Sequence, residues 1–338
     1  MKRSSMLRFL RIATTTTLLI YVFHGAGLLT PAGWQDLFNT FTHTQVSFVL
    51  ASLSMGVFLN FSSSVKWYFL ARARGLSVSL WRLCSYYIIG KFFNLILPSS
   101  IGGDVIRIHE LGRYTGRYAD AAAVVFVERF SGLVTLLVLA LIAVVVNLQV
   151  FNLPWLTISL GAGVCALGVI CWVIVSDFPL KLLRWLIGEK IALFQKFLTK
   201  IAKFRQAVLA YQHNSNALWW AFFNSLIFYF LAIINVWFST LSFDDSVKFL
   251  SVLIATPVIM FIMNLPISIG GIGLLEFAFT FTLGLFGVSP SVAISTALFM
   301  RIKTLIEAGI GGALYYLVSE RHVSPETLSE IAAQKSQE

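Results

Sequence analysis

Apolar segments of about 20 residues recur along almost the whole chain, and this recurrence constrains the fold more than any other feature. The sequence is 58% hydrophobic and only 12% charged, whereas soluble globular proteins are about 25% charged. A barrel strand crosses the hydrocarbon in about 9–11 residues, whereas a spanning helix needs about 20, so segments of this length predict helices rather than barrel strands. We therefore expect an all-α, polytopic membrane protein. Its net charge of +10 is attributed to cytoplasmic loops and anionic lipids, not to nucleic acid.

Six segments are expected to span the bilayer: residues 9–29, 46–70, 118–147, 155–175, 217–241 and 291–317. Lysines and arginines precede the first span and cluster after the second, where Lys66, Arg72 and Arg74 lie, but the connections 30–45 and 148–154 contain none. The positive-inside rule then places both termini in the cytoplasm, in what we expect to be a bacterial inner membrane. The first span follows a basic start and lacks a clear cleavage site, which indicates an uncleaved signal-anchor helix.

Two apolar stretches are interrupted by nearly the same motif, P-x-S-I-G-G. Proline ends a helix, glycines permit a tight reversal, and serine can pair the freed backbone groups. The charge pattern agrees with six spans only if neither interrupted stretch, 80–113 or 247–286, crosses the membrane. We therefore predict two re-entrant hairpins that enter from opposite faces. Their turn residues are Pro98, Ser100, Gly102, Gly103, Pro266, Ser268, Gly270 and Gly271.

The two motifs lie 168 residues apart, from Pro98 to Pro266, and the flanking spans have nearly the same offset. This spacing predicts an inverted repeat, which is typical of secondary transporters with a substrate site near the membrane midplane. The alternative is two glycine-rich helix breaks that match by chance. The expected division is a signal-anchor helix and outer loop (1–45), a first repeat (46–150), a connecting span with a cytoplasmic amphipathic basic helix (151–213), a second, inverted repeat (214–318) and a cytoplasmic polar tail (319–338).

Several charged residues lie within these apolar segments. Each costs about 2.5–3.5 kcal/mol at the centre of a spanning helix, so together they imply a polar interior. Arg129 and Arg301 occupy corresponding positions in the two repeats, and arginine suits phosphate recognition. The candidate substrate-binding residues are Asn94, Asp104, Arg107, Glu128, Arg129, Asn264, Glu276, Arg301 and Lys303. Structural alternatives stay open: Lys303 paired with Glu307, Arg107 extended to the membrane surface, and Glu276 as a helix cap.

The sequence contains no pattern that indicates catalysis or cofactor binding. The five histidines and three cysteines lack the spacing of metal ligands, and no glycine-rich nucleotide loop is followed by lysine and a hydroxyl residue. We therefore expect no catalytic residues, no metal site and no cofactor.

Three motifs carry a resemblance to a known family: N-L-I-L-P-S-S-I-G-G-D-V-I-R (94–107), V-E-R-F-S-G-L (127–133) and P-I-S-I-G-G-I-G-L-L-E (266–276). They resemble the lysylphosphatidylglycerol synthase transmembrane-region family of flippase-like membrane proteins. The resemblance implies a division of labour in those members that carry an additional soluble domain. Their membrane region moves an aminoacylated phospholipid to the outer leaflet, and the soluble domain makes that lipid. We expect no synthase domain here, because the last expected span is followed by about 20 residues. The family motifs map onto Gly102, Gly103, Asp104, Arg107, Glu128, Arg129, Gly270, Gly271 and Glu276.

These features favour a lipid flippase for an anionic or modified phospholipid or a polyprenyl-phosphate-linked lipid. Its partners would be membrane lipids and an envelope-biosynthesis enzyme. One alternative is a membrane glycosyltransferase or lipid-modifying enzyme, or its accessory subunit, that uses Asp104, Glu128 or Glu276 as acid or base. Against it, the longest outer loop has only one acidic residue, Asp36. A third alternative is a scaffold of an envelope complex, in which the intramembrane charges would tolerate substitution.

Overall fold

Helices joined by turns and short irregular segments make up the part of the chain that its computed structural model describes, which is residues 3–25, 27–96, 102–148, 152–176, 178, 192–265, 267–268 and 271–320. Within the described ranges, four helices are long and apolar enough to cross a bilayer: α3 (Val46–Ala73), α6 (Tyr118–Val146), α7 (Pro154–Val175) and α10 (Ser215–Leu241). At about 1.5 Å per residue, each exceeds the ~30 Å of hydrocarbon. These helices confirm the expected all-α, multi-pass membrane fold.

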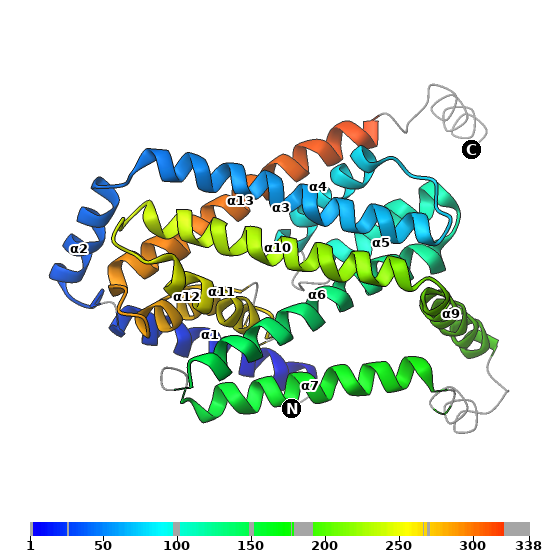
Figure 1. Cartoon of the computed structure of the whole chain (residues 1–338), viewed down its shortest axis with the longest axis horizontal. Coiled ribbons are helices and arrows are strands. Elements are labelled where there is room, and N and C mark those ends of the chain that lie inside the picture. The colour runs from blue at the N-terminus through cyan, green and yellow to red at the C-terminus, as the bar shows by residue number, and fades with distance from the viewer. Residues whose placement is uncertain are drawn as a thin grey trace, which may run out of the picture.

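The other two expected spans fall in helices of different composition. Helix α1 (Arg3–Gly25) is apolar from Ile12 to Gly25, the part of it whose side chains the structure describes. The long helix α13 (Pro290–Glu320) carries Arg301, Lys303 and Glu307, which bind protein groups rather than face lipid. Figure 1 shows α3, α10 and α13 running along the long axis of the molecule, and α3 and α10 make the most extensive helix contact.

Four shorter helices form two hairpins. The first contains α4 (Leu80–Ile96) and α5 (Gly102–Thr115), and the second contains α11 (Phe249–Met263) and α12 (Leu274–Gly284). None of them exceeds 17 residues, or about 26 Å, so none crosses the hydrocarbon alone. The first hairpin occupies one half of the long axis and the second the other half (Figure 1). Four expected turn residues lie outside the described part of the chain: Pro98, Ser100, Pro266 and Gly270.

The glycines of the two hairpins serve different purposes. Gly103 lies where α5 crosses α4, and a Cβ there would be 2.1 Å from the carbonyl oxygen of Gly90. In the second hairpin, Gly271 and Gly273 adopt positive φ angles of 72° and 75°, which favour glycine. The first hairpin therefore needs glycine for close helix packing, and the second needs it for backbone conformation.

Among the described residues, the two larger hydrophobic clusters lie one around each hairpin, and a small third cluster joins α1, α2 and α13. Trp67 and Leu83 belong to the cluster around α4 and α5, whereas Ile259 and Phe279 belong to the cluster around α11 and α12. Helices α6 and α10 contribute buried side chains to both clusters. These two long helices therefore join the halves of the molecule.

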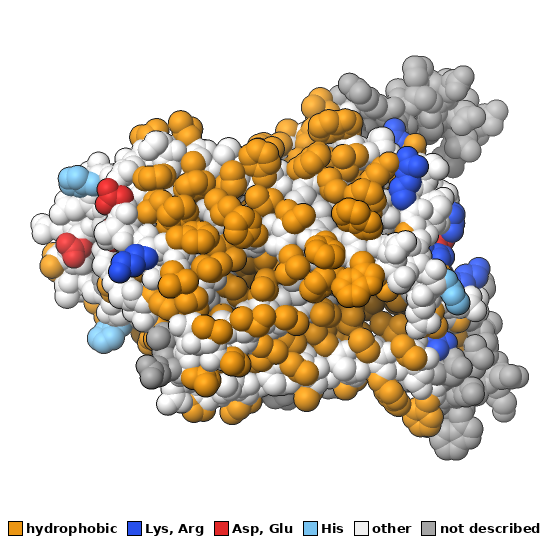
Figure 2. Space-filling view, in the orientation of Figure 1, with side chains coloured by type: hydrophobic (Ala, Val, Ile, Leu, Met, Phe, Trp, Pro, Cys, Tyr) orange, Lys and Arg blue, Asp and Glu red, His pale blue; other side chains and the backbone are white. Residues whose placement is uncertain are grey.

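On the face that Figure 2 shows, a broad apolar belt lies between two polar ends. Hydrophobic side chains cover the middle of this face, with most Lys and Arg side chains at one end and most acidic side chains at the other. Within the belt, Trp219 and Phe223 of α10 are more than half exposed. Exposed apolar area of this extent marks a lipid-facing surface. We call the end that carries most of the cations the basic end.

Two connecting segments differ from a simple loop. The connection 30–45 contains the helix α2 (Pro31–Thr42), where Thr30 accepts a hydrogen bond from the Gly33 amide and Pro31 occupies the first helical position. In the expected amphipathic basic segment, the structure describes α9 (Ala192–Leu209) and the short helix η1 (Ala210–His213) at the basic end (Figure 1). Most of the expected polar tail, 321–338, lies outside the described residues.

Candidate functional site

Five charged side chains from three helices form a connected group, which we call the first charge cluster: Lys66 of α3, Asp104 and Arg107 of α5, and Glu128 and Arg129 of α6. Arg107 is at its centre, with one guanidinium nitrogen 2.6 Å from Glu128 and another 3.1 Å from Asp104. Asp104 also accepts two hydrogen bonds from Arg129, each 2.9 Å long. Buried carboxylates are thus paired with arginine, which offsets their desolvation.

Arg107 is buried rather than extended to the membrane surface. Its guanidinium lies 4.4 Å from the centre of the Trp67 ring and 4.6 Å from that of Tyr87. Arginine stacks on aromatic faces in this way when water is excluded. The alternative of a surface-reaching Arg107 is therefore wrong. In contrast, the side chain of Arg129 is 48% exposed and is the accessible cation of the cluster.

Lys66 also belongs to the first charge cluster, although the charge pattern predicted that it lies at the cytoplasmic surface. We counted it among the cations after the second span, but the structure buries it within α3. Its Nζ donates to the carbonyl oxygen of Glu128 at 3.1 Å and to the Ser225 hydroxyl at 3.2 Å. Helix α3 ends at Ala73, about two turns after Lys66, so position 66 lies within the packed part of the helix and not at its surface end. This part of the prediction was wrong.

The second hairpin has an arginine–carboxylate pair of the same kind. Arg301 of α13 contacts Glu276 of α12 through two hydrogen bonds of 2.7 and 3.0 Å. The partners are 25 residues apart in the sequence, as are Asp104 and Arg129. Glu276 also accepts a hydrogen bond from the Gly273 amide at 2.9 Å, so it caps α12 as one alternative expected. In each half, a bidentate pair therefore joins the returning hairpin helix to the long helix that follows.

Lys303 and Glu307 do not form the pair that their spacing suggested. Lys303 donates to the carbonyl and hydroxyl oxygens of Ser52, at 2.7 and 2.6 Å, and to the side chain of Asn235. Glu307 instead accepts a hydrogen bond from Lys91 of α4 at 2.7 Å. The alternative that Lys303 pairs with Glu307 was therefore wrong, because its partners are Ser52 and Asn235. Lys303 ties α13 to α3 and α10.

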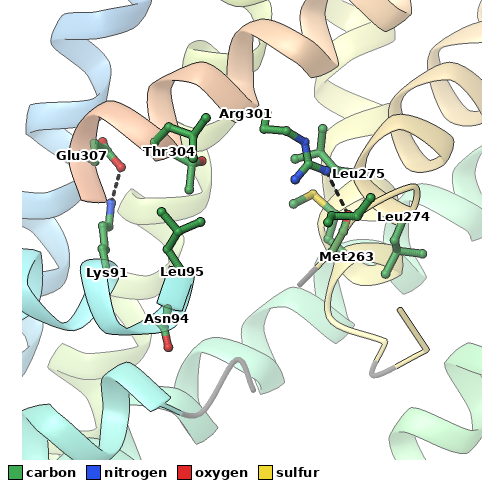
Figure 3. Close-up of a pocket in the computed structure, with 12 residues that line it drawn as sticks. Lys91, Asn94, Leu95, Met263, Leu274, Leu275, Arg301, Thr304 and Glu307 are labelled. Atoms are coloured by element: carbon green, nitrogen blue, oxygen red, sulfur yellow. Dashed lines mark hydrogen bonds and ion pairs between the residues drawn. The ribbon is translucent and has the colours of Figure 1, made fainter. Parts of the chain in front are cut away.

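A cavity of about 550 Å³ lies between the two hairpins and α13. Figure 3 shows Lys91, Asn94 and Leu95 on one side, Met263, Leu274 and Leu275 on the other, and Arg301, Thr304 and Glu307 above them. The Lys91–Glu307 pair spans from α4 to α13, and Arg301 points toward the backbone at Gly271. The cavity thus combines two paired cations with an apolar wall. Arginine and lysine are the side chains that bind phosphate groups.

The expected site residues are distributed over several places. Asn94, Gly271 and Arg301 line the cavity, and Glu276 lies behind Arg301. Asn94 also caps α5, because its side-chain oxygen accepts a hydrogen bond from the Gly103 amide at 2.7 Å. Asn264 ends α11 and donates to the carbonyl oxygen of Met260. Its role in substrate binding stays a prediction, as do the roles of the other candidates.

Our candidate set omitted Lys91 and Glu307, which line the cavity. Both are charged residues within apolar segments, and that was the available signal. Among the residues that the structure describes, no group of histidine, cysteine, aspartate and glutamate has the arrangement of a metal site.

Comparison with known proteins gives a family and two relatives. A UPF0104 membrane protein of Pyrococcus horikoshii is 21% identical over 331 residues, which cover 91% of this chain and 96% of the relative. A UPF0104 membrane protein of Methanocaldococcus jannaschii is 22% identical over 339 residues, which cover 93% and 97%. Both relatives are archaeal, so the bacterial membrane stays a prediction. No solved structure matches significantly. Residues 9–312 match the lysylphosphatidylglycerol synthase TM region, and the chain therefore belongs to that family.

Proposed function

We propose that this protein is a flippase that moves an anionic or modified phospholipid, or a polyprenyl-phosphate-linked lipid, between leaflets of a bacterial inner membrane. Both termini would be cytoplasmic, and a separate envelope-biosynthesis enzyme would supply the substrate. The observation that carries the proposal is the cavity that both hairpins and α13 line. A transporter with an inverted repeat would hold its substrate in such a place.

The composition of the cavity suits a lipid headgroup. Its volume of about 550 Å³ lies within the usual range for sites of small molecules, about 300–1,000 Å³. Leu95, Met263 and Leu305 supply apolar contacts beside Lys91 and Arg301. A molecule with a charged head and an apolar tail matches this mixture better than a fully polar solute.

The balance of charge favours an anionic substrate. The first charge cluster contains three cations and two carboxylates, so it has one positive charge in excess. Its exposed member, Arg129, can add a phosphate oxygen to the hydrogen bonds that it makes with Asp104. At the cavity, a phosphate would compete with Glu276 for Arg301. The carboxylate would then keep the guanidinium paired before and after transport.

The two hairpins supply a mechanism for alternating access. They lie in opposite halves of the molecule (Figure 1), and each is tied to its following helix by an arginine–carboxylate pair of equal sequence separation. Our proposal treats these halves as the two repeats, 46–150 and 214–318. The first would open the cavity toward one leaflet and the second toward the other.

The proposal is tested by leaflet-resolved lipid analysis of cells with and without the gene. We expect that one lipid species disappears from the outer leaflet while the total lipid composition is unchanged. Arg301→Ala and Arg129→Ala should each reproduce this loss. Arg113→Ala is the matched control, because Arg113 is a half-exposed arginine that pairs within its own helix. Its cells should resemble the wild type.

Other outcomes would refute the proposal. If the species disappears from the whole membrane, the protein takes part in lipid synthesis, and the enzyme alternative replaces the flippase. If both arginine variants are made at normal levels and keep wild-type leaflet composition, neither arginine has the assigned role. In that case the scaffold alternative gains support.

A further inference from the structure

A second cavity, separate from the one between the hairpins, lies at the basic end. It has a volume of about 720 Å³ and lies between the start of α6 and one face of α9. Figure 1 shows α9 at this end of the molecule, remote from α2. The lining residues are Gly116, Arg117, Tyr118, Ala119, Asp120, Ala122, Lys200, Ile201, Lys203 and Phe204. None of them was among the candidate residues for lipid transport.

The cavity has an excess of positive charge. Lys200 and Lys203 of α9 are exposed and pair with no acidic group among the described residues. The one carboxylate in the lining, Asp120, is already engaged by two arginines: Arg74 at 2.5 Å and Arg117 at 2.8 Å. Both lysines are therefore available to an anion that enters the cavity.

The start of α6 adds a further attraction for an anion. Among the described residues, no side chain caps this helix, although Arg117 occupies the capping position. Tyr118 and Ala119, the first two helical residues, line the cavity. The unpaired amides and the dipole at the start of a 29-residue helix favour a phosphate group. Helix α6 and helix α9 thus present positive charge to the same space.

The wall of the cavity is also apolar and held in place. Phe204 of α9 packs edge-on against Phe126 of α6, with ring centres 5.6 Å apart. Arg205 donates to the carbonyl oxygens of Ile174 and Val175 at the end of α7, at 2.6 and 2.8 Å. These contacts fix α9 against the spanning helices. Apolar side chains next to cations match a phospholipid, whose phosphate and acyl chain are adjacent, better than free phosphate.

We propose that this cavity binds the phosphate of an anionic phospholipid from the leaflet at the basic end. The lipid would remain with the protein and hold α9 against α6. Basic cavities between membrane helices bind anionic headgroups in this way. The inference is independent of lipid transport, because the cavity shares no lining residue with the one between the hairpins.

Native mass spectrometry of the full chain, titrated with phosphatidylglycerol in detergent, tests the proposal. The wild type should bind phosphatidylglycerol saturably at this cavity, in addition to any molecule held between the hairpins, and should bind phosphatidylcholine at least tenfold more weakly. Lys200→Gln/Lys203→Gln should weaken phosphatidylglycerol binding by about tenfold or more, since each basic residue near a membrane surface contributes to the affinity for an anionic lipid. The control Arg72→Gln/Arg82→Gln removes two exposed arginines that lie outside this cavity. It should change the affinity by no more than about twofold.

A second variant distinguishes binding inside the cavity from a general attraction of anionic lipid to the basic surface. Ala122→Phe keeps every charge but fills the cavity, because Ala122 is part of its wall. It should weaken phosphatidylglycerol binding as the double lysine variant does. Wild-type affinity in Ala122→Phe would overturn the site, as would equal losses in the lysine variant and the arginine control. Displacement of the lipid by millimolar inorganic phosphate would show that free phosphate is the ligand, and would also overturn the proposal.

Discussion

The replacement of Arg107 by methionine tests whether the first charge cluster is held together by buried charge pairing. Methionine has a similar length but no charge, so the substitution leaves little empty volume. Glu128 would lose the cation at 2.6 Å, and its remaining ion-pair partner would be Lys66, whose Nζ is 4.0 Å away. Glu128 is 5% exposed, so water cannot replace the guanidinium.

The magnitude follows from this geometry. Two unit charges 2.6 Å apart attract by about 6 kcal/mol at an effective dielectric constant of about 20. Part of that attraction offsets the desolvation of Glu128, which the folded variant would still bear. Removal of one partner from a buried pair costs about 3–5 kcal/mol. We expect Arg107→Met to lower the free energy of unfolding by this amount.

The double variant Arg107→Met/Glu128→Gln provides the sharper comparison. It removes both charges, and Lys66 keeps its hydrogen bonds to the carbonyl oxygen of residue 128 and to Ser225. In Arg107→Met the buried carboxylate keeps only a cation 4.0 Å away, whereas in the double variant Lys66 loses that carboxylate but keeps two hydrogen-bond acceptors, so the double variant should be the more stable of the two.

The assay is reversible unfolding in mixed micelles by titration with sodium dodecyl sulfate, followed by circular dichroism. Arg117→Met serves as the control, since that side chain is 46% exposed and Asp120 would keep its bond to Arg74. The control should cost no more than about 1 kcal/mol. The reasoning is refuted if the double variant is less stable than Arg107→Met.

The remaining predictions use the same unfolding assay. Gly103→Ala should destabilise the protein more than Gly271→Ala, because its Cβ would lie 2.1 Å from the carbonyl oxygen of Gly90. At Gly271 a Cβ meets nothing within 4 Å, so the expected cost is the positive φ alone, about 1–2 kcal/mol; the reverse order would contradict this account. Tyr211→Phe should cost about 1 kcal/mol, since it removes a 2.8 Å hydrogen bond to the carbonyl oxygen of Leu70. Burial raises the pKa of the Tyr211 phenol, so this donor stays protonated, and unchanged stability would refute its contribution.

The sequence predicted those features that depend on neighbours along the chain. Apolar length located the four long apolar helices, and the glycine-rich motifs located both interrupted stretches. The motif around Asp104 and the one around Glu276 contained the carboxylates that the structure pairs with Arg129 and Arg301. A charged residue at membrane depth is costly unless it is paired, so its presence in an apolar segment identifies it as a candidate.

The features that sequence reasoning missed depend on contacts between distant segments. Lys91 and Glu307 are 216 residues apart, and no local pattern indicates that α4 and α13 meet. Lys66 was predicted to be a surface cation because hydropathy does not show where α3 ends. The helix continues to Ala73, and Lys66 lies within it. The helix α2 was expected as a loop, although Thr30 followed by Pro31 is a recognised helix start.

The equal separation within the two arginine–carboxylate pairs has a consequence for biosynthesis. At about 5–20 residues per second, Arg129 is made about 1–5 seconds after Asp104, and Arg301 follows Glu276 after the same delay. Each hairpin can therefore have its acidic residue neutralised as soon as the next helix emerges from the ribosome. Lys91 must wait about 10–40 seconds for Glu307. The chain thus completes each half in turn, and the wall of the cavity is closed last, when the final helix is inserted.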